Sequence, residues 1–377
     1  MYLLYAPEKK FGRIPPGLQI ISKEVVFYNN IAFCPKYYWL KTHTMAGCVD
    51  ITPRYFKKIR AKRKLKTILI FARGGIGDTM WAMPATRALK EKYPTASIMV
   101  VVEKKHMPIW RGVPYITATS EDGFWNVTGF MSKADEAFDF GGIVTVDPRL
   151  IKNDPIISTF KIIEQPIPKD RKKCRPMLVI TADEGKRAEQ RLNSKGVFLN
   201  EHKIITIGIE SSTSNRNWPF EYVKELTKSL TAIGIKVIWL GTDQTKHDNI
   251  IPYAAKDTGA INLIAGTHIR QAMATIALSD AYVGPSSGLL CIATALEIPS
   301  VGLWGAFDPK CRSTFYDKYI PLWGKHNCSP CKEHWTECRY GHPAPCMKRI
   351  SPSIVHNTVL KLMQKYPRSL ISKKPIE

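Results

Sequence analysis

The chain has 377 residues, 44% of them hydrophobic, which is enough for two domains of ordinary size with buried cores. It carries 55 Lys and Arg against 32 Asp and Glu, and the resulting net charge of +23 indicates a polyanionic partner. No apolar run reaches transmembrane length, the N-terminus lacks a signal-peptide core, and nine cysteines, an odd number, exclude a secreted disulfide framework. We therefore expect a cytoplasmic protein without a transmembrane segment.

The first 65 residues are a basic, aromatic extension. Up to residue 66 there are 14 basic and 3 acidic residues, and the aromatic stretch 27–43 predicts either a small sheet or an extended docking segment. The densest basic run is either a solvated tail or a polyanion-binding surface. We favour the second, because Tyr55 and Phe56 stand beside the charge, although a phosphorylated glycolipid or an acidic membrane face would satisfy the same charge. The run consists of Lys57, Lys58, Arg60, Lys62, Arg63 and Lys64.

Residues 66–103 predict a strand, a glycine turn, a helix and a second strand. The apolar runs 67–72 and 97–102 are typical of strands buried on both faces, and residues 80–89 show helical spacing. The turn between them carries Asp78 and three glycines that allow close backbone approach: Gly74, Gly75 and Gly77. Ligands bind outside the carboxyl ends of strands in open α/β sheets, so Asp78 is either a reactive group or a helix cap.

Strand–helix alternation continues through two halves separated by a polar, Pro-rich stretch. It predicts two facing doubly wound domains with the ligand site in the cleft between them. The second half contains predicted strands 204–209, 236–240, 261–264, 281–283 and 300–304. The predicted division is an extension (1–65), an N-terminal Rossmann-like domain (66–165), a linker (166–199), a C-terminal Rossmann-like domain (200–325), a Cys-rich segment (326–350) and a final helix and tail (351–377).

Several short motifs occur in a fixed order over residues 66–365. They are Gly77-Asp78 with Pro84, Arg216-x-Trp218-Pro219, Gly266-Thr267, the glycine turn 284–296, the 299–305 Pro-x-Val-x-Leu-x-Gly run, and Cys328-x-x-Cys331 with Cys346-Met347. Together they resemble glycosyltransferase family 9, the ADP-heptose:lipopolysaccharide heptosyltransferase family with its GT-B fold. The resemblance also allows a phage member of the family that modifies DNA. Residues 1–65 have no counterpart in it.

The resemblance implies an inverting transfer of a sugar from a UDP- or ADP-linked donor, without a catalytic metal. It makes Asp78 the base that removes the proton of the acceptor hydroxyl, and Arg216 the cation at the donor phosphate. The alternatives are a surface salt bridge for Arg216 and an ordinary helix cap for the two serines of the donor turn. The further expected donor-binding residues are Gly75, Gly77, Thr242, Asp243, Ser286, Ser287 and Gly288.

The donor turn departs from the family pattern Asp-x-Gly-x-x-His at two positions. Ser286 stands in place of the Asp, and Cys291 stands in place of the His. Because the resemblance implies that the Asp faces hydroxyls of the heptose, its loss favours a smaller sugar such as a pentose, or a sugar with different hydroxyls. We expect Cys291 to be a buried helix residue.

Four late cysteines follow the pattern C-x2-C-x6-C-x7-C. This spacing suits a tetrahedral structural site that holds zinc or iron, and the alternative is a set of reduced thiols without a metal. We expect a structural role in either case. The four residues are Cys328, Cys331, Cys338 and Cys346.

Three hypotheses for the function remain. We favour a glycosyltransferase that acts on hydroxymethylated bases of DNA, because this explains the +23 charge, the basic extension and the altered donor turn. The second hypothesis is an enzyme that extends lipopolysaccharide or another anionic surface glycan. The third is an inactive GT-B scaffold that binds nucleic acid, although the presence of both Asp78 and Arg216 argues against it.

Overall fold

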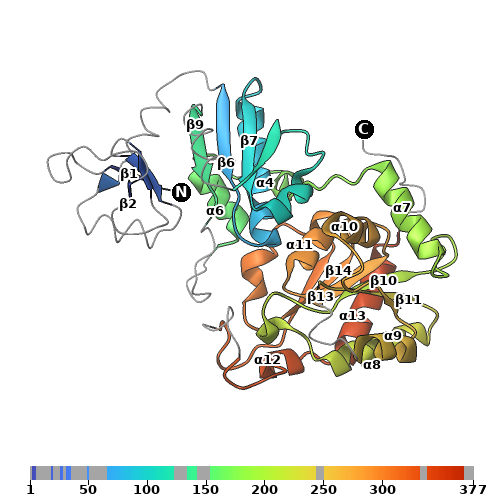
Figure 1. Cartoon of the computed structure of the whole chain (residues 1–377). Helices are drawn as coiled ribbons and strands as arrows, with labels where there is room; N and C mark the ends of the chain where they lie inside the picture. The colour runs from blue at the N-terminus through green and yellow to red at the C-terminus, as the bar shows by residue number, and fades with distance from the viewer. Residues whose placement is uncertain are drawn as a thin grey trace. The chain divides into compact units, whose positions relative to one another are not determined.

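A computed structural model of the chain describes residues 66–122, 134–141, 153–242, 250–331 and 338–368, together with the backbone of five short strands before residue 51. The chain divides into two compact units (Figure 1). Segments Gly74–Ala85 and Pro108–Val113 cluster with the second unit, which otherwise holds the described residues from 153 onward. The domain boundaries expected from the sequence stay predictions.

The five short strands form an antiparallel sheet in the order β2-β3-β4-β1-β5. The longest pairing joins β1 and β4 and runs from Tyr2 opposite Cys34 to Tyr5 opposite Ile31. A small sheet is therefore present in the basic extension. The strands are β1 (Tyr2–Tyr5), β2 (Leu18–Gln19), β3 (Val26–Tyr28), β4 (Ile31–Cys34) and β5 (Val49–Asp50).

The first unit also contains a four-stranded parallel sheet in the order β8-β7-β6-β9. Four of the five residues of β6 are buried, which confirms the expectation of a strand covered on both faces. Helix α4 (Ile76–Lys92) follows β6 and starts within the glycine turn, four residues earlier than its apolar spacing predicts. The strands are β6 (Thr67–Phe71), β7 (Ser97–Val102), β8 (Ala118–Glu121) and β9 (Glu136–Asp139).

The second unit is built on a six-stranded parallel sheet in the order β12-β11-β10-β13-β14-β15. Chain order reverses direction between β10 and β13, and such a switch point opens a crevice at the carboxyl ends of the two strands. The sequence predicted all of these strands except the last. They are β10 (Ile204–Gly208), β11 (Lys236–Leu240), β12 (Ile261–Asn262), β13 (Ala281–Pro285), β14 (Ser300–Trp304) and β15 (Tyr319–Trp323).

Helices cover both faces of this sheet, as Figure 1 shows. One layer contains α8 (Phe220–Thr231), α9 (Ile250–Thr258) and α13 (Pro352–Lys365), and the other contains α7 (Ala182–Asn193), α10 (Ile269–Ala277) and α11 (Gly288–Ala295). Capping boxes start α7 at Thr181 and α10 at His268, and Ser351 with Pro352 starts α13. The remaining short elements are α6 (Pro155–Ile162), α12 (Pro345–Lys348), η1 (Lys104–Trp110), η3 (Arg171–Cys174), η4 (Ser214–Arg216) and η5 (Pro309–Arg312).

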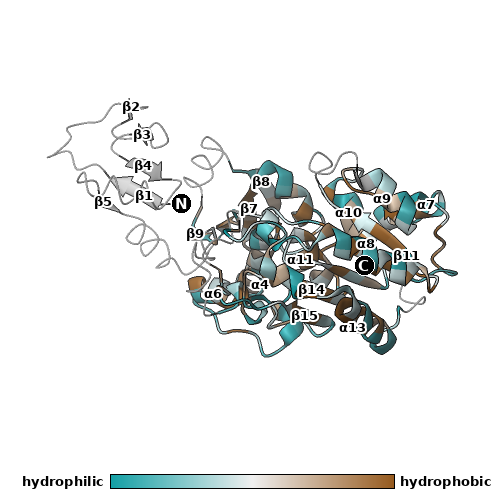
Figure 2. Cartoon of the chain, turned by 90° about the horizontal axis from the view of Figure 1, so that it is seen from below, coloured by the Kyte–Doolittle hydropathy of each residue, from teal (hydrophilic) through white to brown (hydrophobic). Residues whose placement is uncertain are grey.

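Every residue of β10, β13 and β14 is buried, so the sheet forms the core of this unit. In Figure 2 the hydrophobic colouring of β11 contrasts with the hydrophilic colouring of α7, which carries charge on its solvent side. Trp239 and Tyr282 are the largest side chains buried at full depth in the sheet itself. No helix among the described residues is long and apolar enough to cross a membrane.

The buried Tyr282 ring requires two glycines on the sheet. A Cβ atom at Gly208 would lie 2.1 Å from Tyr282 Oη, and one at Gly284 would lie 2.5 Å from the same atom. We expect Gly208→Ala to lower the free energy of unfolding by about 1–3 kcal/mol, because the fully buried ring has no room to move. Thermal or chemical denaturation measures this.

Gly185→Ala is the matched control for that substitution. Nothing lies within 4 Å of a Cβ atom at Gly185, which stands inside α7, so alanine should raise the free energy of unfolding by about 0.5–1 kcal/mol. Equal melting temperatures for the two variants would contradict the packing argument.

Candidate functional site

The turn after β6 holds the Asp78 carboxylate in place. Asp78 Oδ2 accepts a hydrogen bond of 2.7 Å from the Gly75 N–H. Gly74 has a φ of +103°, and a Cβ atom there would lie 2.8 Å from the same carboxylate oxygen, so this position requires glycine on both counts. The first turn of α4 carries Asp78, and the positive end of the helix dipole favours a carboxylate there.

Two glycines allow the N-terminal turn of α4 to meet that of α11. A Cβ atom at Gly288 would lie 2.6 Å from Ile76 Cβ, and a Cβ atom at Gly77 would lie 3.0 Å from Cys291 Sγ. Both helix ends belong to the second unit. The absence of these two side chains therefore brings Asp78 next to the turn between β13 and α11.

Charge and burial act on Asp78 in opposite directions. Burial raises the pKa of its carboxyl above the ordinary value, while the Gly75 N–H and the charges of Arg312 and Arg216 lower it. Burial has the largest effect, so the net pKa is raised. A carboxylate with a raised pKa is a stronger base, which suits removal of a proton from a hydroxyl.

The guanidinium of Arg216 is fixed by its own unit. Its Nε donates to Thr213 Oγ1 at 2.7 Å, its Nη1 to the Ser286 carbonyl at 2.9 Å, and its Nη2 to Ser212 Oγ at 2.6 Å. Burial and the neighbouring Arg312 charge lower its pKa to about 10, so Arg216 stays cationic at neutral pH. Arg216 is 7% exposed, which excludes the alternative of a surface salt bridge.

The donor turn lies at the switch point between β10 and β13. Ser287 is the N-cap residue of α11, yet its side chain makes no capping hydrogen bond. The ordinary helix-cap interpretation therefore does not account for this hydroxyl, which stands with the N–H groups of the first helical turn. Hydroxyl and N–H donors at a helix N-terminus form an anion-binding arrangement. The crevice of the second unit thus combines this turn with Arg216.

Three further charged residues, near the site or near an expected donor contact, were not predicted from the sequence. Glu210 follows β10 and accepts hydrogen bonds from the Thr242 N–H and hydroxyl, which places a carboxylate beside an expected nucleoside contact. Asp154, 3% exposed, has its pKa raised to about 6 by burial. Arg312 stacks on Phe307 and Trp81, with 4.1 Å and 4.9 Å from its Cζ to the ring centroids. A polar residue directly after a buried strand was a usable signal for Glu210. Asp154 caps α6 and Arg312 ends η5, and neither belongs to a recognised motif.

Cys291 lies in α11, as expected, and is half-buried there instead of buried. Its thiol contacts the position of Gly77, and burial raises its pKa to about 12, so the sulfur stays protonated. A neutral thiol at this position cannot replace the hydrogen bonds or the charge of a histidine. The first turn of α11 therefore lacks both ionisable side chains that the family pattern places there.

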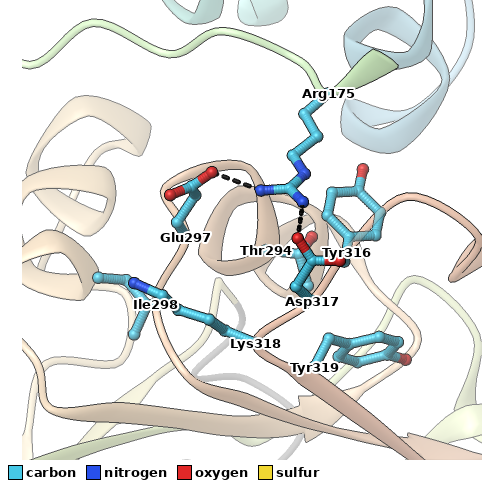
Figure 3. A pocket seen from close by; sticks show the side chains of 8 residues that line it. All are labelled: Arg175, Thr294, Glu297, Ile298, Tyr316, Asp317, Lys318 and Tyr319. Atoms are coloured by element: carbon cyan, nitrogen blue, oxygen red, sulfur yellow. Dashed lines mark hydrogen bonds and ion pairs between the residues drawn. The ribbon is translucent and has the colours of Figure 1, made fainter. Parts of the chain in front are cut away.

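A separate pocket lies at the C-terminal end of α11 (Figure 3). Arg175 reaches across it and forms ion pairs with Glu297 and Asp317. None of the predicted site residues lines this pocket, and we assign it a structural role because its polar groups are paired with each other. The lining residues are Arg175, Thr294, Glu297, Ile298, Tyr316, Asp317, Lys318 and Tyr319.

The four late cysteines are neighbours in the structure. The pKa of the Cys346 thiol is raised to about 11, by burial and by the charges of the other three cysteines. Among the described residues, which omit 332–337, no three His, Cys, Asp or Glu side chains are arranged to hold a metal ion. A four-thiol set nevertheless has the donor chemistry for zinc or iron, so the metal stays a prediction.

Some predicted site residues lie outside the described part of the chain. They are Asp243 and the whole basic run Lys57, Lys58, Arg60, Lys62, Arg63 and Lys64. Within the described residues, the structure brings Gly75, Gly77, Asp78, Arg216 and the 286–288 turn together in the second unit. Thr242 stands apart from them, at the end of β11.

The chain resembles known proteins in sequence and in fold. Residues 145–341, more than half of the chain, match the sequence model of glycosyltransferase family 9 (heptosyltransferase). Lipopolysaccharide heptosyltransferase 2 of Salmonella typhimurium is 33% identical over 98 residues, which is 25% of this chain and 28% of that relative. The sequence match thus spans little more than a quarter of the relative's length.

Solved structures extend the likeness to most of the chain. The Escherichia coli ADP-heptose lipopolysaccharide heptosyltransferase II has a TM-score of 0.61 and 18% identity, over 79% of this chain and 99% of that one. The iron-containing dodecameric glycosyltransferase TibC of enterotoxigenic Escherichia coli has a TM-score of 0.59 and 15% identity, over 80% and 77%. The two parallel sheets with their helices are therefore those of a GT-B fold, as the sequence predicted.

The cysteine cluster is testable through its metal content. We expect about one zinc or iron ion per chain in the purified protein, measured by inductively coupled plasma mass spectrometry, and its loss in Cys331→Ser. Cys174→Ser is the control, because Cys174 lies buried away from the cluster at the end of η3. The prediction would be contradicted if the purified protein contains no metal and a chelator does not change its melting temperature.

Proposed function

Because this chain belongs to glycosyltransferase family 9, we propose that it transfers a sugar from a nucleotide-sugar donor to an acceptor hydroxyl, with inversion at the anomeric carbon. The observation that carries the proposal is the position of the Asp78 carboxylate. It lies within the electrostatic reach of two arginines, beside the N-terminal turn of a helix at the switch point of a parallel sheet.

The proposed step needs a base and a stabilised leaving group, and the site offers both. The acceptor oxygen forms a bond to the anomeric carbon while the bond from that carbon to the phosphate oxygen breaks. The proton of the hydroxyl goes to Asp78, and the electron pair leaves with the nucleoside diphosphate. Arg216 and the N–H groups after Ser287 are placed to bind the negative charge that develops on that diphosphate.

Two classes of donor are consistent with the chain. The structural neighbour from Escherichia coli is described as an ADP-heptose enzyme, which supports ADP-heptose as the donor. Ser286 and Cys291 in place of the Asp and His of the family pattern favour a sugar with fewer or different hydroxyls. We propose an ADP-linked sugar and keep a UDP-linked sugar as the alternative. Selective binding of ADP-heptose would refute a smaller sugar.

An anionic surface glycan is the acceptor that the relatives favour. The Salmonella relative is a lipopolysaccharide heptosyltransferase, and phosphate groups on such a glycan would complement part of the +23 charge. The second candidate acceptor is DNA with hydroxymethylated bases. The specific observation in its favour is the basic run at 57–64 with its adjacent aromatics, and no comparison supports it. A cytoplasmic location follows from neither candidate and remains a prediction.

A mass-spectrometric transfer assay decides between the acceptors. The protein is offered ADP- and UDP-sugars, including ADP-heptose, with either phosphorylated lipopolysaccharide core or 5-hydroxymethylcytosine duplex DNA. Sugar mass on the core oligosaccharide supports the glycan acceptor, and sugar mass on the nucleoside establishes DNA. Transfer to neither acceptor, without hydrolysis of any donor, would overturn the proposed activity and leave the inactive, nucleic-acid-binding scaffold.

A charge-neutral variant of the extension separates binding from chemistry in the same assay. Replacing the six basic residues 57, 58, 60, 62, 63 and 64 by glutamine should reduce transfer to DNA, and its salt dependence, by orders of magnitude if DNA is the acceptor. Transfer to an uncharged hydroxyl acceptor should not change. An unaltered salt dependence would remove these residues from the acceptor site.

Asp78→Asn should abolish transfer while leaving donor affinity nearly unchanged. The amide keeps the shape of the side chain but cannot accept the acceptor proton, so we expect a loss of at least about 100-fold in kcat. Donor affinity by calorimetry is the control. Turnover within a few-fold of the parent protein would exclude Asp78 as the base.

The pH profile tests the same residue independently. Asp78 must be ionised to act as a base, so kcat/KM should fall as the pH drops through its raised pKa, at a higher pH than for an ordinary aspartate. A raised carboxyl pKa means that the folded state binds this proton more tightly, so protonation of Asp78 does not favour unfolding. A profile that is flat down to the ordinary aspartate range would contradict this role.

A further inference from the structure

Arg312 is a half-buried cation with unused hydrogen-bond donors. Its Nε and Nη2 atoms are inaccessible to solvent and have no hydrogen-bond partner among the described residues. Burial lowers the pKa of the guanidinium, and the nearby Asp78 and Asp154 offset this only in part. Leaving a buried charged donor unpaired is costly, so an anion is missing from its environment.

The two unused donors lie on one edge of the guanidinium. Nε–H and Nη2–H point in parallel from the side of an arginine, and this pair matches two oxygens of a carboxylate or phosphate group. Arg216 differs in this respect, because its Nε, Nη1 and Nη2 each donate to a protein oxygen. Of the two arginines, Arg312 is therefore the one with a complete edge that has no protein partner among the described residues.

The position of the Arg312 side chain is fixed by aromatic rings. The guanidinium lies over the rings of Phe307 and Trp81. Trp81 is three residues after Asp78 on α4, so the two side chains share a face of that helix. Arg312 also lowers the pKa of Asp78 more than Arg216 does. These contacts place Arg312 beside the carboxylate and the first turn of α11.

The loop that carries Arg312 is anchored immediately after it. The Thr314 N–H donates to Asp154 Oδ2 at 3.3 Å, and the Thr314 carbonyl accepts from Arg171 Nη2 at 2.7 Å. Arg175 Nε donates to the Phe315 carbonyl at 2.6 Å, and its other nitrogens pair with Glu297 and Asp317 (Figure 3). A preorganised cation does not have to be reoriented during a reaction, which is the property required for stabilising charge on a leaving group.

We propose that Arg312 binds the diphosphate of the nucleotide-sugar donor through Nε and Nη2, and stabilises the negative charge that the diphosphate gains when the sugar leaves. The ligand is an anion, because the edge formed by Nε and Nη2 matches two oxygens of a phosphate group. Its location beside the donor turn favours the diphosphate over a charged group of the acceptor. This inference rests on the proposed function and adds to it a catalytic residue that contacts the substrate.

The experiment compares the binding of adenosine, AMP and ADP, and of uridine, UMP and UDP, by calorimetry. Arg312→Met should lower affinity for the diphosphate of the preferred base on the order of 10- to 100-fold, as expected for lost hydrogen bonds between charged groups. Affinity for the nucleoside should stay within about twofold. Arg312→Lys should fall between, because lysine keeps the charge but loses the paired donors.

Lys310→Ala is the matched control, since Lys310 is exposed on the same short helix and should leave all affinities unchanged. Thermal melting identifies any variant that fails to fold, and Arg312→Lys decides the case if Arg312→Met does not fold. An unchanged diphosphate affinity in a folded variant, including one accompanied by a raised KM for the acceptor, overturns the assignment of Arg312. Equal losses for nucleoside and diphosphate overturn it as well, because they indicate a structural role.

The same data separate this inference from the proposed function. If the unsubstituted protein binds neither ADP nor UDP, the nucleotide-sugar donor itself is wrong, and the role of Arg312 falls with it. If the unsubstituted protein binds the nucleoside diphosphate more tightly than the nucleoside, and Arg312→Met shows the same difference in affinity, only the role of Arg312 is wrong.

Discussion

The close approach of two helix N-termini is the constraint on which the site depends. Helices α4 and α11 meet at Gly77 and Gly288, where any side chain would collide with Cys291 or Ile76. Through this contact the glycine turn after β6 belongs to the compact unit built on the six-stranded sheet. As a result, a carboxylate that belongs by sequence to the first α/β half takes part in the electrostatics of the second.

A cluster of charged groups follows from that contact. Arg216 and Arg312 lie near Asp78, Asp154 lies near Arg312, and the helix end adds positive potential that is complementary to an anion. Each arginine is held in a different way: Arg216 by hydrogen bonds from all three nitrogens, and Arg312 by two aromatic rings and a loop anchored from the 154–175 segment. Such fixation is unfavourable without a ligand, which is the physical reason to connect it with function.

Much of the fold could be predicted because buried parallel strands are visible as apolar runs. The strands at 97–102, 236–240 and 300–304 have the bounds that the sequence predicted. Strand β15 is an apolar run as well, but Pro321 within it weakens the strand signal, and each of its residues is half-exposed. Helix α7 lies in the stretch predicted to be a linker. The Pro-rich start of that stretch favoured the linker interpretation, although a Thr–Glu capping box follows it and starts the helix.

The sequence by itself determined the family, the alternation of strands and helices, and the positions of Asp78 and Arg216, because each of these depends on residues that are close together along the chain. Only the tertiary structure decided which of those residues share a site. Arg312 and Asp154 both lie more than 70 residues after Asp78 in the chain. Arg312 interacts with both carboxylates through contacts that no local motif encodes. Their importance comes from burial and unsatisfied charge, and these are properties of the packed chain.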